Sequence, residues 1–147
     1  MDYGFVRIAS VVPTGNVADC DANVDCIISN ISAACERGAQ LVVFPELSVT
    51  GYTCGDLFKQ STLLRSAFNG LHRIKAATKG KNALVIVGAP ISYEGRLFNC
   101  AIAICNGRIM GMVPKTYIPN YHEFYEKRWF TSSYNLRKNA TIEVDGE

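Results

Sequence analysis

Two charged residues of opposite sign follow prolines at the ends of strand-like runs. The run Leu41 to Phe44 leads into Pro45 and then Glu46, and a second run ends at Val113, with Lys115 two residues later. Proline cannot donate to a strand ladder, so both charges are predicted at strand ends, where α/β proteins hold catalytic groups on rigid supports. If those strands lie close together, the carboxylate and the ammonium would couple strongly. The spacing alone fits either a catalytic acid-base pair or a structural ion pair that joins two loops.

The first elements needed to position Glu46 are a strand, a helix and a second strand. A short apolar run predicts the strand over 7–12, and helical spacing of apolar residues predicts an amphipathic helix over 21–37, with Asp21 as N-cap and Gly38 as the C-terminal stop. A strand over 41–44 follows. The helical crossover is long enough for parallel pairing of the two strands.

The second half of the chain predicts another helix and an antiparallel hairpin that carries Lys115. Apolar residues at helical spacing continue to about residue 78, and an uninterrupted apolar run over 83–90 predicts a central strand. Two further strands flank Asn106-Gly107, the dipeptide best suited to a type I′ turn. We therefore expect a mixed sheet fed by two βα units. A last strand is expected over 140–144.

The composition limits the class of protein. At 147 residues the chain is one domain or part of one, and 48% hydrophobic residues, 19% charged residues and a net charge of +2 are typical of a globular protein. The basic residues are scattered along the sequence, which argues against a nucleic-acid-binding function. No segment resembles a signal peptide or a membrane span, so we expect a cytoplasmic protein. The six cysteines have no CxxC spacing and the two histidines are far apart, so reduced thiols and no metal site are expected.

Longer motifs around the two charges resemble a known family. The first is Val43-Phe44-Pro45-Glu46-Leu47 with Thr50-Gly51-Tyr52, and the second runs from Val113 to Phe130 and includes Pro119-Asn120-Tyr121-His122-Glu123-Phe124-Tyr125-Glu126-Lys127-Arg128. They resemble the nitrilase, or carbon–nitrogen hydrolase, superfamily. Within it they look most like the glutaminase domains of bacterial glutamine-dependent NAD+ synthetases. The resemblance covers nearly the whole chain and implies an α/β fold, the first half of an α-β-β-α sandwich, and homo-oligomers formed through nitrilase-type interfaces.

The resemblance also implies site residues. That superfamily works with a Glu-Lys-Cys triad, which maps its glutamate onto Glu46 and its lysine onto Lys115. Glu46 would be the general base for the thiol, and Lys115 would stabilise the oxyanion. Glu126 matches a second glutamate that orients the lysine, or else is a surface acid. Tyr52 and Tyr121 are expected as walls of the substrate site, although ordinary core tyrosines would look the same.

The nucleophile is where the sequence departs from the family pattern. The cysteine should follow Lys115, but the last cysteine is Cys105, and neither Cys105 nor Cys54 has the expected context. We therefore expect residues 1–147 to be a partial glutaminase domain, truncated before the nucleophile and inactive alone. In the parent, the resemblance implies that glutamine supplies ammonia for the amidation of nicotinic acid adenine dinucleotide, with ATP and Mg2+. No cofactor is expected within the chain itself.

Two other functions stay open at this point. One is a stand-alone carbon–nitrogen hydrolase that acts on a small amide or an N-carbamoyl compound, which an ATP-binding Ser-Gly-Gly loop downstream would exclude. The other is a non-catalytic interaction module that keeps the fold and has lost the nucleophile. A downstream cysteine labelled by an electrophilic glutamine analogue would exclude that module.

Overall fold

The computed structural model describes residues 4–136 and residue 141, which form one mixed sheet with two long helices. The elements, in chain order, are β1 (Ile8–Ser10), α1 (Cys20–Glu36), β2 (Leu41–Val43), η1 (Gly55–Lys59), α2 (Ser61–Ala77), β3 (Leu84–Tyr93), β4 (Arg96–Cys105), β5 (Arg108–Pro114), η2 (Glu126–Arg128) and η3 (Ser133–Asn135), where η marks a 3₁₀ helix.

The five strands lie in the sheet in the order in which they occur in the chain. β1, β2 and β3 are parallel, and β3, β4 and β5 are antiparallel. The two parallel pairs follow from the helical crossovers, as the sequence predicted. At the β4–β5 turn, Asn106 and Gly107 have φ of 46° and 77°. Both residues are left-handed, as a type I′ turn requires, so the predicted mixed sheet and hairpin are confirmed.

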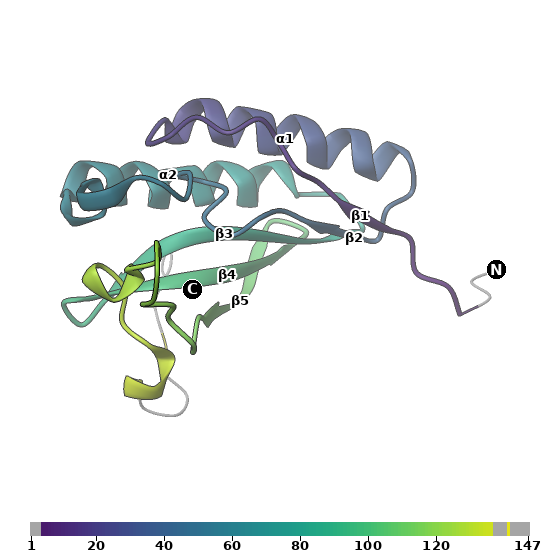
Figure 1. Ribbon diagram of the computed structural model, residues 1–147. Coiled ribbons are helices and arrows are strands. Elements are labelled where there is room, and N and C mark those ends of the chain that lie inside the picture. The colour runs from purple at the N-terminus through teal and green to yellow at the C-terminus, as the bar shows by residue number, and fades with distance from the viewer. Residues whose placement is uncertain (1–3, 137–140, 142–147) are drawn as a thin grey trace.

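The two helices pack against each other on the same face of the sheet (Figure 1). Their apolar stripes cover the strand residues that point toward them, including Val42, Val85 and Ile104, which are at most 1% exposed. The alternate residues of the strands, such as Ile8 and Leu84, point to the face without helices and are 59% and 37% exposed. The segment after β5 lies on this second side (Figure 1).

Several element boundaries differ from those predicted. α1 begins at Cys20 because Asp19, and not Asp21, is the N-cap: the carboxylate of Asp19 accepts from the backbone N–H of Ala22. The Asp21 carboxylate instead accepts a hydrogen bond from Arg73 on α2, at 3.0 Å. β3 runs three residues beyond Pro90, since β4 pairs with it along its whole length. The strand expected over 140–144 lies outside the described residues.

Candidate active site

The loop that carries Glu46 leaves β2 and is pressed against β3. Gly88 of β3 makes this possible, because a Cβ atom there would lie 2.3 Å from the backbone nitrogen of Leu47. The loop is tied to the same glycine twice: Ser48 Oγ accepts from the Gly88 N–H at 3.1 Å, and the Val49 N–H donates to the Gly88 carbonyl at 3.1 Å. Glu46 therefore has a rigid backbone on the helix-free face of the sheet.

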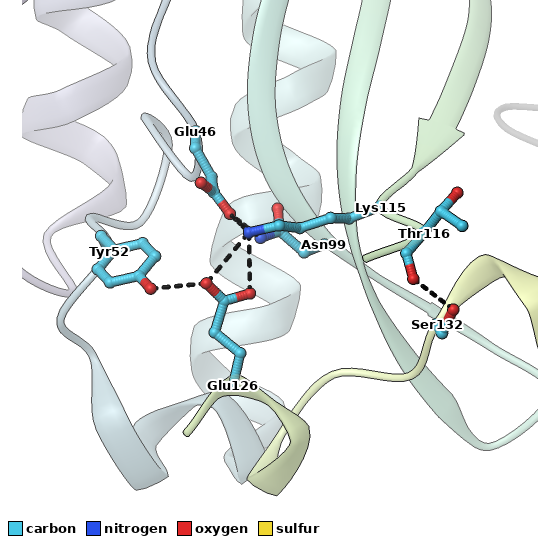
Figure 2. Close-up of polar contacts among 7 residues, drawn as sticks. All are labelled: Glu46, Tyr52, Asn99, Lys115, Thr116, Glu126 and Ser132. Atoms are coloured by element: carbon cyan, nitrogen blue, oxygen red, sulfur yellow. Dashed lines mark hydrogen bonds and ion pairs between the residues drawn. The ribbon is translucent and has the colours of Figure 1, made fainter. Parts of the chain in front are cut away.

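Lys115 follows directly after β5 and is fixed by its main chain. Its N–H donates to the carbonyl of Asn99 on β4 at 2.8 Å, and its carbonyl accepts from Ser133 at 3.1 Å. The lysine therefore starts from the end of the edge strand β5, and its long side chain extends toward Glu46 and Glu126 (Figure 2).

The side chains of Glu46, Lys115 and Glu126 converge (Figure 2). Lys115 Nζ donates to Glu46 Oε1 at 2.7 Å and lies 3.1 Å from both Glu126 Oε1 and Glu126 Oε2. Glu46 and Glu126 thus share one ammonium group, although they lie 69 and 11 positions from Lys115 in the sequence. The predicted proximity of Glu46 and Lys115 is confirmed, and Glu126 is not a solvated surface acid, since it is only 3% exposed.

Glu126 is placed by η2 and its neighbours. The Glu126 N–H donates to Pro119 O at 3.1 Å. Its carboxylate also accepts a hydrogen bond from the Tyr52 hydroxyl, at 2.6 Å between Tyr52 Oη and Oε1. The hydroxyl of Tyr52, a residue that we expected as a wall of the substrate site, thus donates to Glu126, and Tyr52 holds the second carboxylate against the lysine. Tyr121 is 63% exposed and lies near Tyr52, at the border of the cluster.

The charges of the cluster favour an ionised lysine. Partial burial lowers the pKa of Lys115, but hydrogen bonds and Coulombic attraction from Glu46 and Glu126 outweigh it and raise that pKa above its ordinary value. Desolvation and the hydrogen bond to Glu126 raise the pKa of the Tyr52 hydroxyl. Lys115 is therefore a permanent cation and Tyr52 a neutral donor at pH 7.

Asn99 belongs to the cluster, and the sequence reasoning missed it. Its Nδ2 donates to Glu46 Oε1, the oxygen that also accepts from Lys115. Asn99 is 4% exposed and points to the helix-free face, opposite Pro90 of β3. The signal was a polar side chain within the otherwise apolar β4 run, where a buried amide needs a hydrogen-bond partner.

No cysteine stands in this cluster. Adjacent strand residues point to opposite faces, so Cys100 lies on the other side of the sheet from Asn99, where burial raises the pKa of its thiol to about 12. Burial likewise raises the pKa of Cys54, whose thiol donates to Thr50 O. All six cysteines are free thiols, and none is seen to contact Glu46, Lys115 or Glu126. The part of the chain that the structure describes also has no group of three or more His, Cys, Asp or Glu side chains able to hold a metal ion.

Comparison with known proteins gives this geometry a family. The model of the carbon-nitrogen hydrolase family matches residues 7–144. The chain belongs to the carbon-nitrogen hydrolase family. The Glu46–Lys115 pair thus lies in the fold that the two motifs around these residues predicted. Within residues 4–136 there is no helix long and apolar enough to cross a membrane.

Relatives that this chain resembles in sequence include glutamine-dependent NAD(+) synthetases. One from Mycobacterium tuberculosis is 36% identical over 144 residues, which make up 98% of this chain and 21% of that protein. One from Xylella fastidiosa is 37% identical over 130 residues, 86% of this chain and 23% of that protein. The chain therefore spans about a fifth of the length of these relatives.

Solved structures agree with the nitrilase-type fold. A glutamine-dependent NAD(+) synthetase from Cytophaga hutchinsonii has a TM-score of 0.84 and 29% identity, and the match covers 95% of this chain and 23% of that one. The Acinetobacter baumannii synthetase in complex with ADP has a TM-score of 0.75 and 27% identity over 95% of this chain and 26% of that one. An amidase from Nesterenkonia sp. shares the fold, with a TM-score of 0.73, 22% identity and coverage of 86% of this chain and 48% of that one.

Proposed function

We propose that this chain supplies Glu46, Lys115 and Glu126 to a glutaminase site that releases ammonia from the side-chain amide of glutamine. The observation that carries the proposal is the convergence of two carboxylates on one ammonium, with one carboxylate oxygen left open. A purely structural ion pair needs no such open oxygen. The nucleophilic cysteine of this site lies outside residues 1–147.

Glu46 is the general base of the proposed reaction. It takes the thiol proton as the sulfur attacks the amide carbon of glutamine, and returns it to the nitrogen as the C–N bond breaks. Ammonia leaves, and the acyl group stays on the sulfur as a thioester. Water, deprotonated by the same carboxylate, then hydrolyses the thioester to glutamate. The Glu46 side chain is 42% exposed, so a substrate and a thiol have access to it.

Lys115 stabilises the charge that develops on the amide oxygen during the attack. A fixed ammonium does this best when nothing has to reorganise as the charge appears. Glu126 and Tyr52 provide that fixation, because the buried carboxylate holds Nζ through both oxygens while it accepts a hydrogen bond from the tyrosine hydroxyl. Tyr121, exposed beside Tyr52, is proposed as a wall for the aliphatic part of glutamine.

The ammonia is proposed to serve NAD+ synthesis in a longer parent protein. The relatives that support this are glutamine-dependent NAD(+) synthetases, one of which binds ADP. In the parent, ATP with Mg2+ would activate nicotinic acid adenine dinucleotide, and ammonia would amidate it. A cytoplasmic location and homo-oligomers built through nitrilase-type interfaces are further parts of this proposal.

The experiment uses the natural polypeptide that contains this chain, purified in its wild-type form and as the Glu46→Gln variant. With glutamine labelled by ¹⁵N at the amide, ATP and nicotinic acid adenine dinucleotide, the wild type should produce ¹⁵N-labelled NAD+. Glu46→Gln should lower the glutaminase rate by at least about 100-fold, because it removes the base, yet keep the synthesis from free ammonium.

Other outcomes separate the competing functions. Hydrolysis of small amides but no NAD+ would identify a stand-alone carbon–nitrogen hydrolase. Absence of both hydrolysis and labelling by an electrophilic glutamine analogue would identify a non-catalytic module. The 147-residue chain is the negative control, and glutaminase activity from it would contradict the absence of the nucleophile.

A further inference from the structure

Asn99 contacts both partners of the Glu46–Lys115 pair. Its side-chain Nδ2 donates to Glu46 Oε1, and its main-chain carbonyl accepts the Lys115 N–H at 2.8 Å. The residue lies within β4 and pairs with Pro90 of β3 on one side, while Lys115, the residue after β5, donates to its carbonyl on the other. Its backbone therefore cannot shift without disturbing both neighbours. Asn99 thus contacts the Glu46 side chain and the Lys115 backbone from one fixed position in the sheet.

The hydrogen bonds to Glu46 are distributed unevenly between its two oxygens. Asn99 and Lys115 both donate to Oε1, whereas Oε2 receives no hydrogen bond from any described residue. Figure 2 shows the second oxygen turned away from Lys115 and Asn99. Two donors on one oxygen fix the rotation of the carboxylate, and the oxygen without donors is the one with its lone pairs free to accept a proton.

We propose that Asn99 is a positioning residue that holds Glu46 Oε1 so that Oε2 faces the reacting groups. Lys115 alone would not fix the orientation of the Glu46 carboxylate, because its ammonium is a rotatable group on a flexible stem and is also attracted by Glu126. The amide of Asn99 is a directional donor on a rigid strand. Its burial costs free energy unless it is hydrogen-bonded, so Glu46 and Asn99 hold each other in place.

The kinetic test rests on the proposed glutaminase function and uses the same natural polypeptide. Asn99→Leu has a similar size and no donor, and Asn99→Asp keeps the shape while it replaces the donor by an acceptor. Both should lower kcat for glutamine hydrolysis by about 10- to 100-fold through misplacement of the base, with KM changed by less than about threefold. Asn99→Asp keeps the test decisive if the leucine variant fails to fold.

Cys100→Ala is the matched control. Cys100 is the next residue of β4, is likewise 4% exposed, and points to the opposite face of the sheet. It should lose stability but keep kcat, since the active-site face is untouched. A raised KM with unchanged kcat in the Asn99 variants would overturn the proposal and make Asn99 a substrate contact. Equal losses of kcat in Cys100→Ala would also overturn it, because they would show a general effect of the core.

Crystal structures of the same polypeptide separate this inference from the proposed function. In Asn99→Leu, the Glu46 carboxylate should rotate or occupy two conformers, while the Lys115–Glu126 contact stays. An unmoved Glu46 would overturn the inference whatever the activity. If the wild type hydrolyses no glutamine, the proposed function fails, and the position of Glu46 in these structures still decides the role of Asn99.

Discussion

Two glutamates share one lysine, and their surroundings give them different tasks. The Glu126 side chain is 4% exposed and has both oxygens hydrogen-bonded, to Lys115 and to Tyr52. The Glu46 side chain is 42% exposed and has one open oxygen. A carboxylate with every site occupied can orient a neighbour but has little room for a proton, whereas an accessible oxygen can accept one.

Replacing Glu126 by Gln tests its supporting role. The amide would face the Lys115 ammonium with a donor or leave the Tyr52 hydroxyl without its acceptor, so a buried polar group loses its partner. We expect urea unfolding to show a loss of about 1–3 kcal/mol in the free energy of unfolding. The control is Glu123→Gln, an exposed acid of the same segment. Equal stability of the two variants would contradict the role of Glu126.

A substitution at Gly88 tests whether β3 supports the loop that carries Glu46. A methyl group there would meet Leu47 N at 2.3 Å and Pro45 O at 2.7 Å, both of them backbone atoms that cannot rotate away. Gly88→Ala should cost about 1–3 kcal/mol by overpacking and move the Glu46 loop. The control is Gly111→Ala on β5, where a Cβ atom meets nothing within 4 Å. Chemical denaturation measures both, and a neutral Gly88→Ala would show that the loop is not pressed on the strand.

At the scale of elements, a small clamp joins η1 to η2. The Asp56 carboxylate of η1 accepts two hydrogen bonds from Arg128, each at 2.7 Å, and one from the Trp129 indole at 2.9 Å. Phe58 of η1 adds an edge-to-face contact with Phe130, with ring centroids 4.9 Å apart. Because η1 follows Tyr52 and η2 contains Glu126, the clamp brings the tyrosine and the glutamate into contact.

The clamp should make stability depend on pH. Hydrogen bonds from Arg128 and Trp129 lower the pKa of Asp56. Because the pKa is lowered, this contribution to stability is fully present above the unfolded pKa of about 3.9 and is lost as the pH falls from there through the lower folded pKa. Asp56→Asn should therefore lower Tm at pH 7, and its difference from the wild type should shrink between about pH 4 and pH 2. Thermal unfolding across this range is the measurement.

The control for Asp56 is another exposed ion pair. Glu94, at the β3–β4 turn, lies 3.0 Å from Arg96, and ion pairs at the surface contribute little. Glu94→Gln should leave Tm nearly unchanged at both ends of the pH range. A pH-independent Tm difference for Asp56→Asn would show that the lost packing of Arg128 and Trp129, and not the charge, explains the effect.

At the scale of the whole molecule, the sheet has one face covered by the two helices and one face without helices. We call the latter the open face, although it is buried around Asn99. Rows of paired residues cross the open face, with Ile8, Leu84 and Val113 at 59%, 37% and 68% exposure. The catalytic candidates lie on this same side, since Asn99 shares the face of Val113. Large exposed apolar side chains on one face of a sheet mark a surface that other groups tend to cover.

The exposed apolar residues of the open face should bind a hydrophobic dye in the isolated chain. Anilinonaphthalene sulfonate should fluoresce in its presence, and the triple variant Ile8→Thr, Leu84→Thr and Val113→Thr should weaken the signal without changing the far-ultraviolet circular dichroism. Leu57→Thr, at an exposed apolar position of η1, is the control and should leave the signal unchanged. Equal fluorescence from all variants would show that the open face does not bind the dye.

The sequence by itself determined the mixed sheet, the tight hairpin turn and the two charged residues at strand ends. These features are local: apolar periodicity sets the element type, Asn106-Gly107 sets the turn, and Pro45 and Pro114 mark where the strands stop. The expected roles of Glu46, Lys115 and Glu126 also came from motifs that are contiguous in the chain. Their catalytic roles, and those of Tyr52 and Tyr121, stay predictions.

Only the tertiary structure decided which side chains complete the cluster and which oxygen stays open. Asn99 is 53 residues from Glu46, and the hydroxyl of Tyr52 reaches Glu126 across 74 residues. The tertiary structure likewise gives Asp21 a partner on another helix, Arg73, whereas Asp19 is the N-cap. Such pairings depend on strand register and helix packing, because distances between side chains far apart in the sequence are set by the whole fold and not by local propensity.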